Sequence, residues 1–302
     1  MKILIAYDGS DCAEAALDDL QRAGLPRQAE VLVVTVTEIW LPPPHAESFE
    51  LLMTASGQPP VIEKAQGFAL RAVELLQNNF GEWTVHSRIQ SGSPGSAILN
   101  VAEEWHPDLI VVGSHGRSAF GRLVLGSVSQ KVVTEAGCSV RVARGNVEVE
   151  TTAARLIVGS DGGPGSAIAV EMVASREWPR GSEARVVAVH ESLRPSLVGR
   201  VMPLVGDWLD KVNTEETSWI EVELEKAAEK LRNAGLTVDS RLMEGDPRHV
   251  LVEVAREWNA HSIFVGATSH KGRARMFLLG SVSSAVTARA HCSVEVVRSE
   301  IS

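Results

Sequence analysis

The segment Leu109-Ile110-Val111-Val112-Gly113-Ser114-His115-Gly116 leads from a run of apolar residues into a glycine-rich turn, and nine residues later the chain continues with Gly126-Ser127. A short continuous apolar run is typical of a strand covered on both faces of a parallel sheet. Ser127, with Gln130 three residues on, predicts a capping box that starts a helix. Glycine lets the backbone approach an anion closely, and a helix N-terminus offers unpaired N–H groups. The segment therefore predicts a strand, loop and helix of an α/β protein in which the loop can hold a phosphate.

The pattern around this segment occurs twice in the chain. An offset of 153 residues takes Asp8-Gly9 to Asp161-Gly162 and Gly113 to Gly266. After the loop the offset is 154, so that Gly126-Ser127 matches Gly280-Ser281. The two halves thus differ in net length by one residue, which is gained inside this loop. We expect one domain written twice, at residues 1–147 and 152–302.

Each half alternates short apolar runs with segments of helical periodicity. In the first half we expect strands at residues 3–6, 31–36, 85–89, 109–112 and 140–142. Apolar residues recur with helical spacing over residues 12–23, 62–79 and 96–104, ahead of the helix that starts at Ser127. Such alternation implies a parallel sheet with right-handed crossovers. The proline-containing stretch 38–60 has no clear pattern, and its counterpart 191–213 has the same spacing between flanking markers, so we expect both to be structured.

The last strand of each half would leave a free sheet edge. These strands are Val140-Arg141-Val142 and Val294-Glu295-Val296, and exposed edges need covering. Pairing the two edges within the chain would bring together repeat-equivalent residues of opposite charge, Arg141 and Glu295. We therefore expect an intrachain pseudo-dimer of the two domains, and a homodimer of whole chains is a further possibility.

Composition narrows the function classes. The chain is 44% hydrophobic with a formal net charge of -9, and residues 1–150 hold 11 Lys and Arg against 18 Asp and Glu. This acidity argues against nucleic acid or an anionic membrane as a partner. No apolar run reaches the ~18 residues that span a bilayer. Three scattered cysteines are too few for a disulfide framework or a metal cluster, and we expect a cytoplasmic protein in which they fill apolar space.

Three sequence elements fall at carboxyl ends of predicted strands, where open α/β sheets bind ligands. The Asp8 carboxylate can accept hydrogen bonds from ribose hydroxyls, or hold Mg²⁺ through water. Backbone groups near Val36 can meet the edge of a base. The phosphates would be held by N–H groups and a hydroxyl of the glycine loop, from Gly113, Gly116, Gly126 and Ser127. Arg117 and Arg122 add positive charge to this loop in an acidic half.

Structural interpretations compete with these assignments. Asp8-Gly9-Ser10 is also an ordinary turn and helix N-cap signal. The glycine spacing matches neither the P-loop, which needs a Gly-Lys-Ser/Thr ending, nor the dinucleotide Gly-x-Gly-x-x-Gly pattern. His115 and His270 have no partner carboxylate or nucleophile at motif spacing, so we expect them to face solvent. Trp105 and Trp258 hold matching helix positions and favour core packing over base stacking.

Asp8-Gly9-Ser10, Gly92-Ser93-Pro94 and Gly113-x2-Gly116-x9-Gly126-Ser127 together resemble the universal stress protein family, over nearly the whole chain. The resemblance implies an α/β fold of two tandem Rossmann-like domains, each a five-stranded parallel sheet flanked by helices. In that family the late glycine motif marks members that bind ATP. Carried over, Asp8 lies near ribose and metal, Val36 gives the backbone contact to adenine, and the glycines with Ser127 form the phosphate cradle. Ala6 departs from the proline that ATP-binding relatives often have.

The second half departs from the motif in its loop. It keeps Asp161, Val189, Gly266, Gly280 and Ser281. Ser269 replaces the second motif glycine, and the loop gains positive charge from His270, Lys271, Arg273 and Arg275. Two hypotheses follow: the second domain binds no nucleotide, or it holds an anion with a reshaped loop. We favour weakened or absent ATP binding.

Three functions are compatible with these residues. The first is an ATP-binding stress-response or regulatory protein in which ATP, with Mg²⁺, occupies the first domain and controls an unidentified protein partner. The second is an interaction module of the same fold that binds no nucleotide. The third, a slow ATPase, is least favoured because the sequence offers no nucleophile–base pair and no catalytic lysine in a motif.

Overall fold

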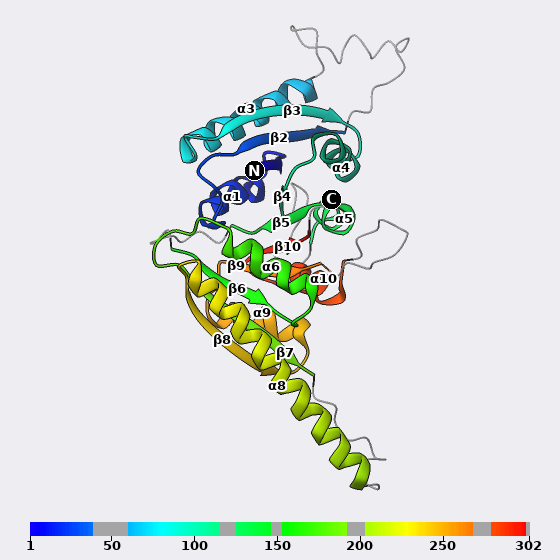
Figure 1. The fold of residues 1–302 in the computed structure, drawn as a ribbon. Coiled ribbons are helices and arrows are strands. Elements are labelled where there is room, and N and C mark those ends of the chain that lie inside the picture. Colours follow the sequence, from blue (N-terminus) through cyan, green and yellow to red (C-terminus); the bar gives the residue numbers. More distant parts are fainter. Residues whose placement is uncertain (39–59, 115–124, 146–152, 192–202, 268–278, 300–302) are drawn as a thin grey trace.

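The computed structural model describes residues 1–38, 60–114, 125–145, 153–191, 203–267 and 279–299, without the side chains of 203–216. Figure 1 shows two domains stacked end to end and joined through one sheet. The first domain contains β1 (Lys2–Ala6), α1 (Asp11–Asp19), the 3₁₀ turn η1 (Leu20–Arg22), β2 (Glu30–Thr37), α3 (Pro60–Asn79), β3 (Thr84–Ser91), α4 (Pro94–Trp105), β4 (Leu109–Gly113), α5 (Ser127–Glu135) and β5 (Ser139–Ala143).

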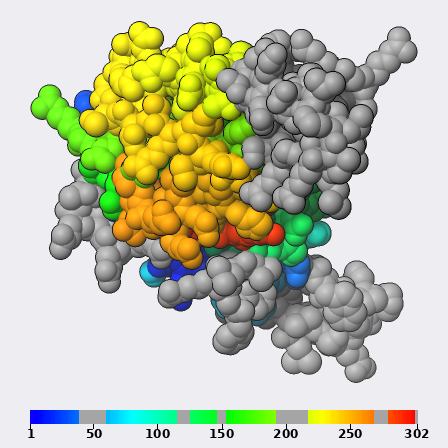
Figure 2. All heavy atoms as spheres, turned by 90° about the horizontal axis from the view of Figure 1, so that it is seen from below, coloured from blue at the N-terminus to red at the C-terminus, as the bar shows by residue number. Residues whose placement is uncertain are grey.

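The second domain repeats this order of elements. It contains β6 (Arg155–Gly159), α6 (Pro164–Ala174), β7 (Glu183–His190), α8 (Pro203–Asn233), β8 (Thr237–Glu244), α9 (Pro247–Glu257), β9 (Ser262–Gly266), α10 (Ser281–Arg289) and β10 (Ser293–Val297). Helix α8 extends beyond the sheet at the far end of the molecule (Figure 1). Seen from that end, the yellow-to-orange chain, from residue 217 of α8 through α9, forms much of the surface (Figure 2).

The described strands form one ten-stranded sheet in the order β3-β2-β1-β4-β5-β10-β9-β6-β7-β8. Strands within each domain pair in parallel, as the alternation of strands and helices predicts. The predicted α/β fold class, with a five-stranded sheet in each domain, is therefore confirmed. In each domain the second and third strands lie on one side of the first strand, and the fourth and fifth strands lie on its other side. This reversal puts a topological switch point beside β1 and another beside β6.

Helices cover both faces of the sheet, because alternate strand residues point to opposite sides. In the first domain Ile3 and Ile5 pack under α1 and α3, whereas Leu4 packs under α4 and α5. The core on the α4–α5 side continues without interruption into the second domain, where it includes residues of α9 and α10. Trp105 and Trp258 pack against this shared core, so the core interpretation of the matched tryptophans is confirmed.

The two domains meet where β5 and β10 pair antiparallel, in the register Val294↔Val142, Glu295↔Arg141 and Val296↔Val140. The predicted pairing of the two edge strands within the chain is thus confirmed. The β5 edge of the first domain and the β10 edge of the second therefore cover each other. Among the described strands, β3 and β8 are left as the ends of the continuous sheet.

The structure corrects several local predictions. Helix α5 has Gly126 as its N-cap and no side-chain capping hydrogen bond, so the predicted Ser127–Gln130 capping box is wrong. Ser127 is instead the first helical residue. The first helix was expected to reach Ala23, but it ends at Asp19 and continues as a 3₁₀ turn. Residues 39–59 lie outside the description, as do 192–202, whereas 203–213 of the counterpart stretch form the start of α8.

In the part of the chain that the structure describes, no helix is both long and apolar enough to cross a membrane.

Candidate functional site

The residues predicted to contact a nucleotide come from three neighbouring strands. Because β1 lies between β2 and β4, the end of β1 adjoins both Val36 on β2 and Gly113 on β4. Asp8 follows β1 by two residues. Gly126 and Ser127 lie at the start of α5, on the chain that leaves β4. The fold thus gathers Asp8, Val36 and Gly113 at one switch point, while Gly116 and Arg117 lie outside the described residues.

The Asp8 carboxylate takes part in a turn that starts α1. Its Oδ1 accepts hydrogen bonds from the Ser10 N at 3.0 Å and from the Ser10 Oγ at 2.6 Å. Ser10 in turn is the N-cap, and its Oγ accepts from the Ala13 N at 3.2 Å. Gly9 between them has φ +72, a left-handed conformation that favours glycine. The turn and cap interpretation of Asp-Gly-Ser is therefore correct, and it fixes Asp8 at the strand end.

The backbone of Val36 faces the same space. The Tyr7 N donates to the Val34 O at 3.0 Å, so the amide groups of Val34 point toward β1. Groups two residues apart on a strand point the same way, and therefore those of Val36 also point to the β1 side. The last paired residue of β1 is Ala6, opposite Val34. The N–H and C=O of Val36 are thus directed past the end of β1, toward the turn that holds Asp8.

The glycine loop closes at its base. The Gly126 N donates to the Ser114 O at 2.9 Å, and the Ser114 N donates to the Ala143 O at 3.1 Å. Ser129, in the first turn of α5, donates from its Oγ to the Gly113 O at 2.6 Å. These bonds hold the start of α5 against the end of β4. A helix start whose N-cap has no side chain offers its first N–H groups to an external acceptor.

The second domain keeps this frame. The Ser283 Oγ donates to the Gly266 O at 2.8 Å, which repeats the bond between Ser129 and Gly113. A Cβ on Gly266 would lie 2.1 Å from the Gly165 O, because the start of α6 packs directly on the end of β9. The space that glycine leaves at this strand end is therefore filled by protein. Residues 268–278, with Ser269 and the four predicted cationic side chains, lie outside the description.

The Asp-Gly turn of each domain is covered by an aromatic ring, which the sequence analysis did not anticipate. A Cβ on Gly9 would meet the Phe68 ring at 2.3 Å, and one on Gly162 would meet the Trp219 ring at 2.5 Å. Phe68 lies on α3 and Trp219 on α8, and the two rings are not at the same repeat offset. Sequence alignment of the halves therefore gives no signal for this pairing.

Metal and thiol chemistry find little support. In the described parts of the chain, no group of three or more His, Cys, Asp or Glu side chains is arranged to hold a metal ion. Burial raises the pKa of Cys138 to about 11 and that of Cys292 to about 12, so both thiols stay protonated. These two cysteines serve as apolar filling, as predicted. His115 and His270 fall outside the description.

Comparisons with known proteins show the family and the fold of the chain. The profile of the universal stress protein family matches residues 1–144 and again 153–298. A universal stress protein of Mycobacterium tuberculosis is 27% identical over 302 residues, covering 98% of this chain and 96% of its own. The crystal structure of a universal stress protein from Archaeoglobus fulgidus superposes with TM-score 0.63 at 20% identity, over 98% of this chain and 96% of that one. A further solved structure, of a universal stress protein in complex with cAMP, covers 48% of this chain and 96% of its own at 23% identity and TM-score 0.33.

Proposed function

The chain belongs to the universal stress protein family, and on that premise we propose that it is a cytoplasmic stress-response regulator whose first domain binds ATP. The observation that carries the proposal is the convergence at one switch point of Asp8, the backbone of Val36, and Gly113 with the uncapped start of α5. Each group matches one part of a nucleotide: a carboxylate for ribose, amide groups for a base edge, and N–H groups for phosphates. Gly116 and Arg117 complete the proposed site from the loop.

The residues present fit ATP better than they fit a bound metal. The Asp8 Oδ1 already accepts two hydrogen bonds from Ser10, and one carboxylate does not make a cation site. We therefore assign no Mg²⁺ site to the protein's own side chains. Mg²⁺ would reach the site only together with the phosphates of ATP.

The second domain is proposed to bind ATP weakly or not at all. Supporting this, a Cβ on Gly266 would lie 2.1 Å from the Gly165 O, so the backbone at the start of α6 packs against this strand end. The repeat-equivalent of Gly165 in the first domain is Cys12, so the two helix starts differ at this contact. A stoichiometry of one ATP per chain follows.

Equilibrium dialysis of the full chain with ATP tests the proposal, with Gly126→Val and Gly280→Val as matched variants. Both glycines have extended backbone (φ -64, ψ 151 and φ -62, ψ 156), which valine adopts without strain. Each variant places a branched side chain at the N-cap of a helix. We expect one ATP per wild-type chain, loss of binding in Gly126→Val, and wild-type binding in Gly280→Val.

The same experiment separates the alternatives. Absence of ATP binding by the wild-type chain would reject the proposal and favour an interaction module that works without nucleotide. Equal loss in both variants would place ATP in both domains. Release of ADP at a rate that Asp8→Asn abolishes would favour an ATPase over a binding protein.

A further inference from the structure

Arg298, the residue after β10, reaches from the second domain into the first. Its Nη2 donates to the backbone O of Val133 in α5, and its Nη1 donates to the Cys138 O at 3.2 Å. Its backbone N donates to the Ser139 Oγ at 3.1 Å. The side chain is buried. Three contacts from one residue of the second domain therefore tie the end of α5 and the start of β5 in the first.

Arg144, the residue after β5, makes the reciprocal set of contacts. Its Nη2 donates to the Thr287 O in α10 at 2.6 Å, and its Nη1 donates to the Cys292 O at 3.4 Å. Its backbone N donates to the Ser293 Oγ at 2.9 Å. Each partner is the repeat-equivalent, at an offset of 154, of a partner of Arg298. The two arginines thus form a pseudo-symmetric pair, in which each donates a hydrogen bond to the last helix of the other domain.

Arg298 supplies what α5 lacks at its C-terminal end. The last carbonyls of a helix have no intrahelical donor, and this end carries partial negative charge that a cation stabilises. The last turn of α5 contains no basic residue of its own. Burial lowers the pKa of Arg298, which reflects how far its guanidinium is removed from water. The cation at the end of α5 therefore comes from the other domain.

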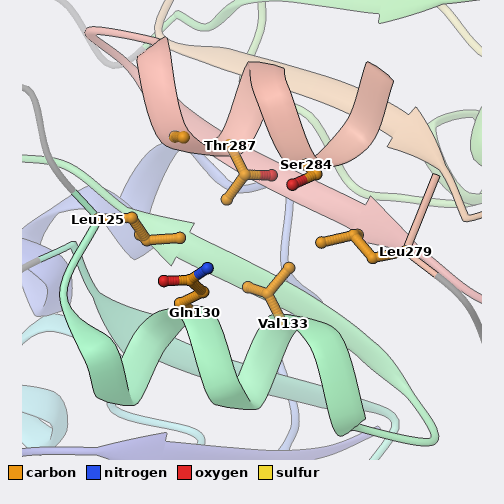
Figure 3. Close-up of a pocket in the computed structure, with 7 residues that line it drawn as sticks. Leu125, Gln130, Val133, Leu279, Ser284 and Thr287 are labelled. Carbon is orange, nitrogen blue, oxygen red and sulfur yellow. The ribbon is translucent and has the colours of Figure 1, made fainter. Parts of the chain in front are cut away.

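Helix α5 faces α10 of the second domain across the domain junction. Where α5 and α10 face each other, a cavity of about 170 Å³ separates them (Figure 3). Side chains of the two domains point into it from opposite sides: Leu125, Gln130 and Val133 face Leu279, Ser284 and Thr287. Leu125 immediately precedes Gly126. The bond from Ser129 to Gly113 holds α5 near its start, and Arg298 holds it near its end.

We propose that Arg298 is a positioning residue for the nucleotide site of the first domain, although it belongs to the second. This inference rests on the proposed function. Helix α5 has Gly126 and Ser127 at its start and is one continuous helix of nine residues. A shift at the Val133 carbonyl therefore displaces the N–H groups that would meet the phosphates. Through the same contact, the second domain controls the ATP affinity of the first.

Arg298→Met and Arg144→Met in the full chain form the matched test, because both remove repeat-equivalent hydrogen bonds. We expect similar losses of thermal stability in the two variants. ATP affinity measured by calorimetry should fall about tenfold in Arg298→Met, the equivalent of about 1.4 kcal/mol, and stay within about twofold of wild type in Arg144→Met. Hydrogen–deuterium exchange, which needs no nucleotide, should rise in residues 127–135 for Arg298→Met and in 281–289 for Arg144→Met.

Each outcome bears on a different statement. Equal ATP affinities in the two variants, with the wild type binding ATP, would overturn the positioning role and leave the proposed function intact. A wild-type chain that binds no ATP would overturn the proposed function, while the exchange pattern would still decide whether Arg298 positions α5. If Arg298→Met does not fold, Arg298→Lys and Arg144→Lys, which keep the charge but lose the second donor group, decide by the same comparison.

Discussion

Arg141 and Glu295 lie directly opposite each other across the junction of the two domains, both fully buried, with Nη1 and Oε2 3.5 Å apart. Arg141 also bonds the Asp19 carboxylate at 2.8 Å, and Arg176 bonds Glu295 from the other side. The four charges sum to zero. Burial alone would lower the pKa of Arg141, but the carboxylates of Asp19 and Glu295 outweigh it and raise that pKa. The domain junction is therefore a closed ionic network inside an apolar sheet.

Removing the charge of Glu295 should destabilise the whole chain. Glu295→Gln leaves Arg176 and one side of Arg141 buried without a full counter-charge, which costs about 3–5 kcal/mol in comparable buried pairs. Urea unfolding measures the loss. Glu104→Gln is the control, because it breaks the exposed pair with Arg88 and should cost at most about 1 kcal/mol. Similar losses in both variants would contradict a structural role for the network.

Two glycines should respond to alanine in opposite directions. Gly9→Ala forces a side chain onto a residue with φ +72 and into contact with the Phe68 ring, so we expect destabilisation of more than about 1 kcal/mol. Gly67→Ala, in α3, meets nothing within 4 Å and should stabilise the helix by about 0.5–1 kcal/mol. Thermal unfolding of both variants gives the comparison. A stabilised Gly9→Ala would show that the Asp-Gly turn can rearrange.

Ser129→Ala removes the hydroxyl that holds the start of α5 on β4. The Gly113 O then lacks its donor, which should cost about 1–2 kcal/mol of unfolding free energy. Ser283→Ala removes the equivalent bond to the Gly266 O and should cost a similar amount. If the first domain alone holds ATP, only Ser129→Ala should weaken ATP binding. Weakening by Ser283→Ala as well would indicate a second site.

Acid should destabilise the protein through His261. Burial, together with the nearby charges of Arg22 and Arg155, lowers the pKa of His261 from 6.5 to about 4. Its Nδ1 accepts from the Arg155 N at 3.0 Å, which only the neutral ring can do. Between about pH 6.5 and pH 4, the His261 imidazole is therefore protonated in the unfolded chain but stays neutral in the folded chain. Stability contributed by the neutral ring is complete above pH 6.5 and is lost as the pH falls toward 4.

His261→Asn keeps an acceptor near the Nδ1 position but cannot titrate. Its urea unfolding free energy, measured from pH 7 to pH 4, should fall less steeply than that of the wild type. The slope should not vanish, because burial and the charges of Arg256 and Arg144 also lower the pKa of His291. A slope equal to that of the wild type would show that folding does not lower the pKa of His261.

Most of the fold follows from local signals in the chain. Buried strands such as β1 and β4 read as continuous apolar runs because both of their faces are covered, and the repeat offset fixes the second domain once the first is recognised. The start of α5 was misassigned because Ser127 and Gln130 have the residue types of a capping box. In the structure Gly126 takes the cap position, and Ser129 rather than Ser127 is bonded to β4.

The candidate site was only partly predictable. Asp8, Val36 and Gly113 could be named because each sits at the end of a predicted strand, and those ends meet wherever strand order reverses. The rings of Phe68 and Trp219 over the Asp-Gly turns could not be named, since helix rotation and the different lengths of α3 and α8 decide which side chain reaches the turn.

The sequence by itself determined the α/β repeat, the two equivalent strand edges and the opposite charges of Arg141 and Glu295. Periodicity and spacing suffice for these, because they depend on neighbours along the chain. Only the tertiary structure decided which residues from the two halves share one core, that Asp19 and Arg176 complete the ionic network, and that Arg144 and Arg298 exchange contacts with the opposite helices. These contacts join residues more than a hundred positions apart, and those between the two domains exist only once β5 and β10 are paired.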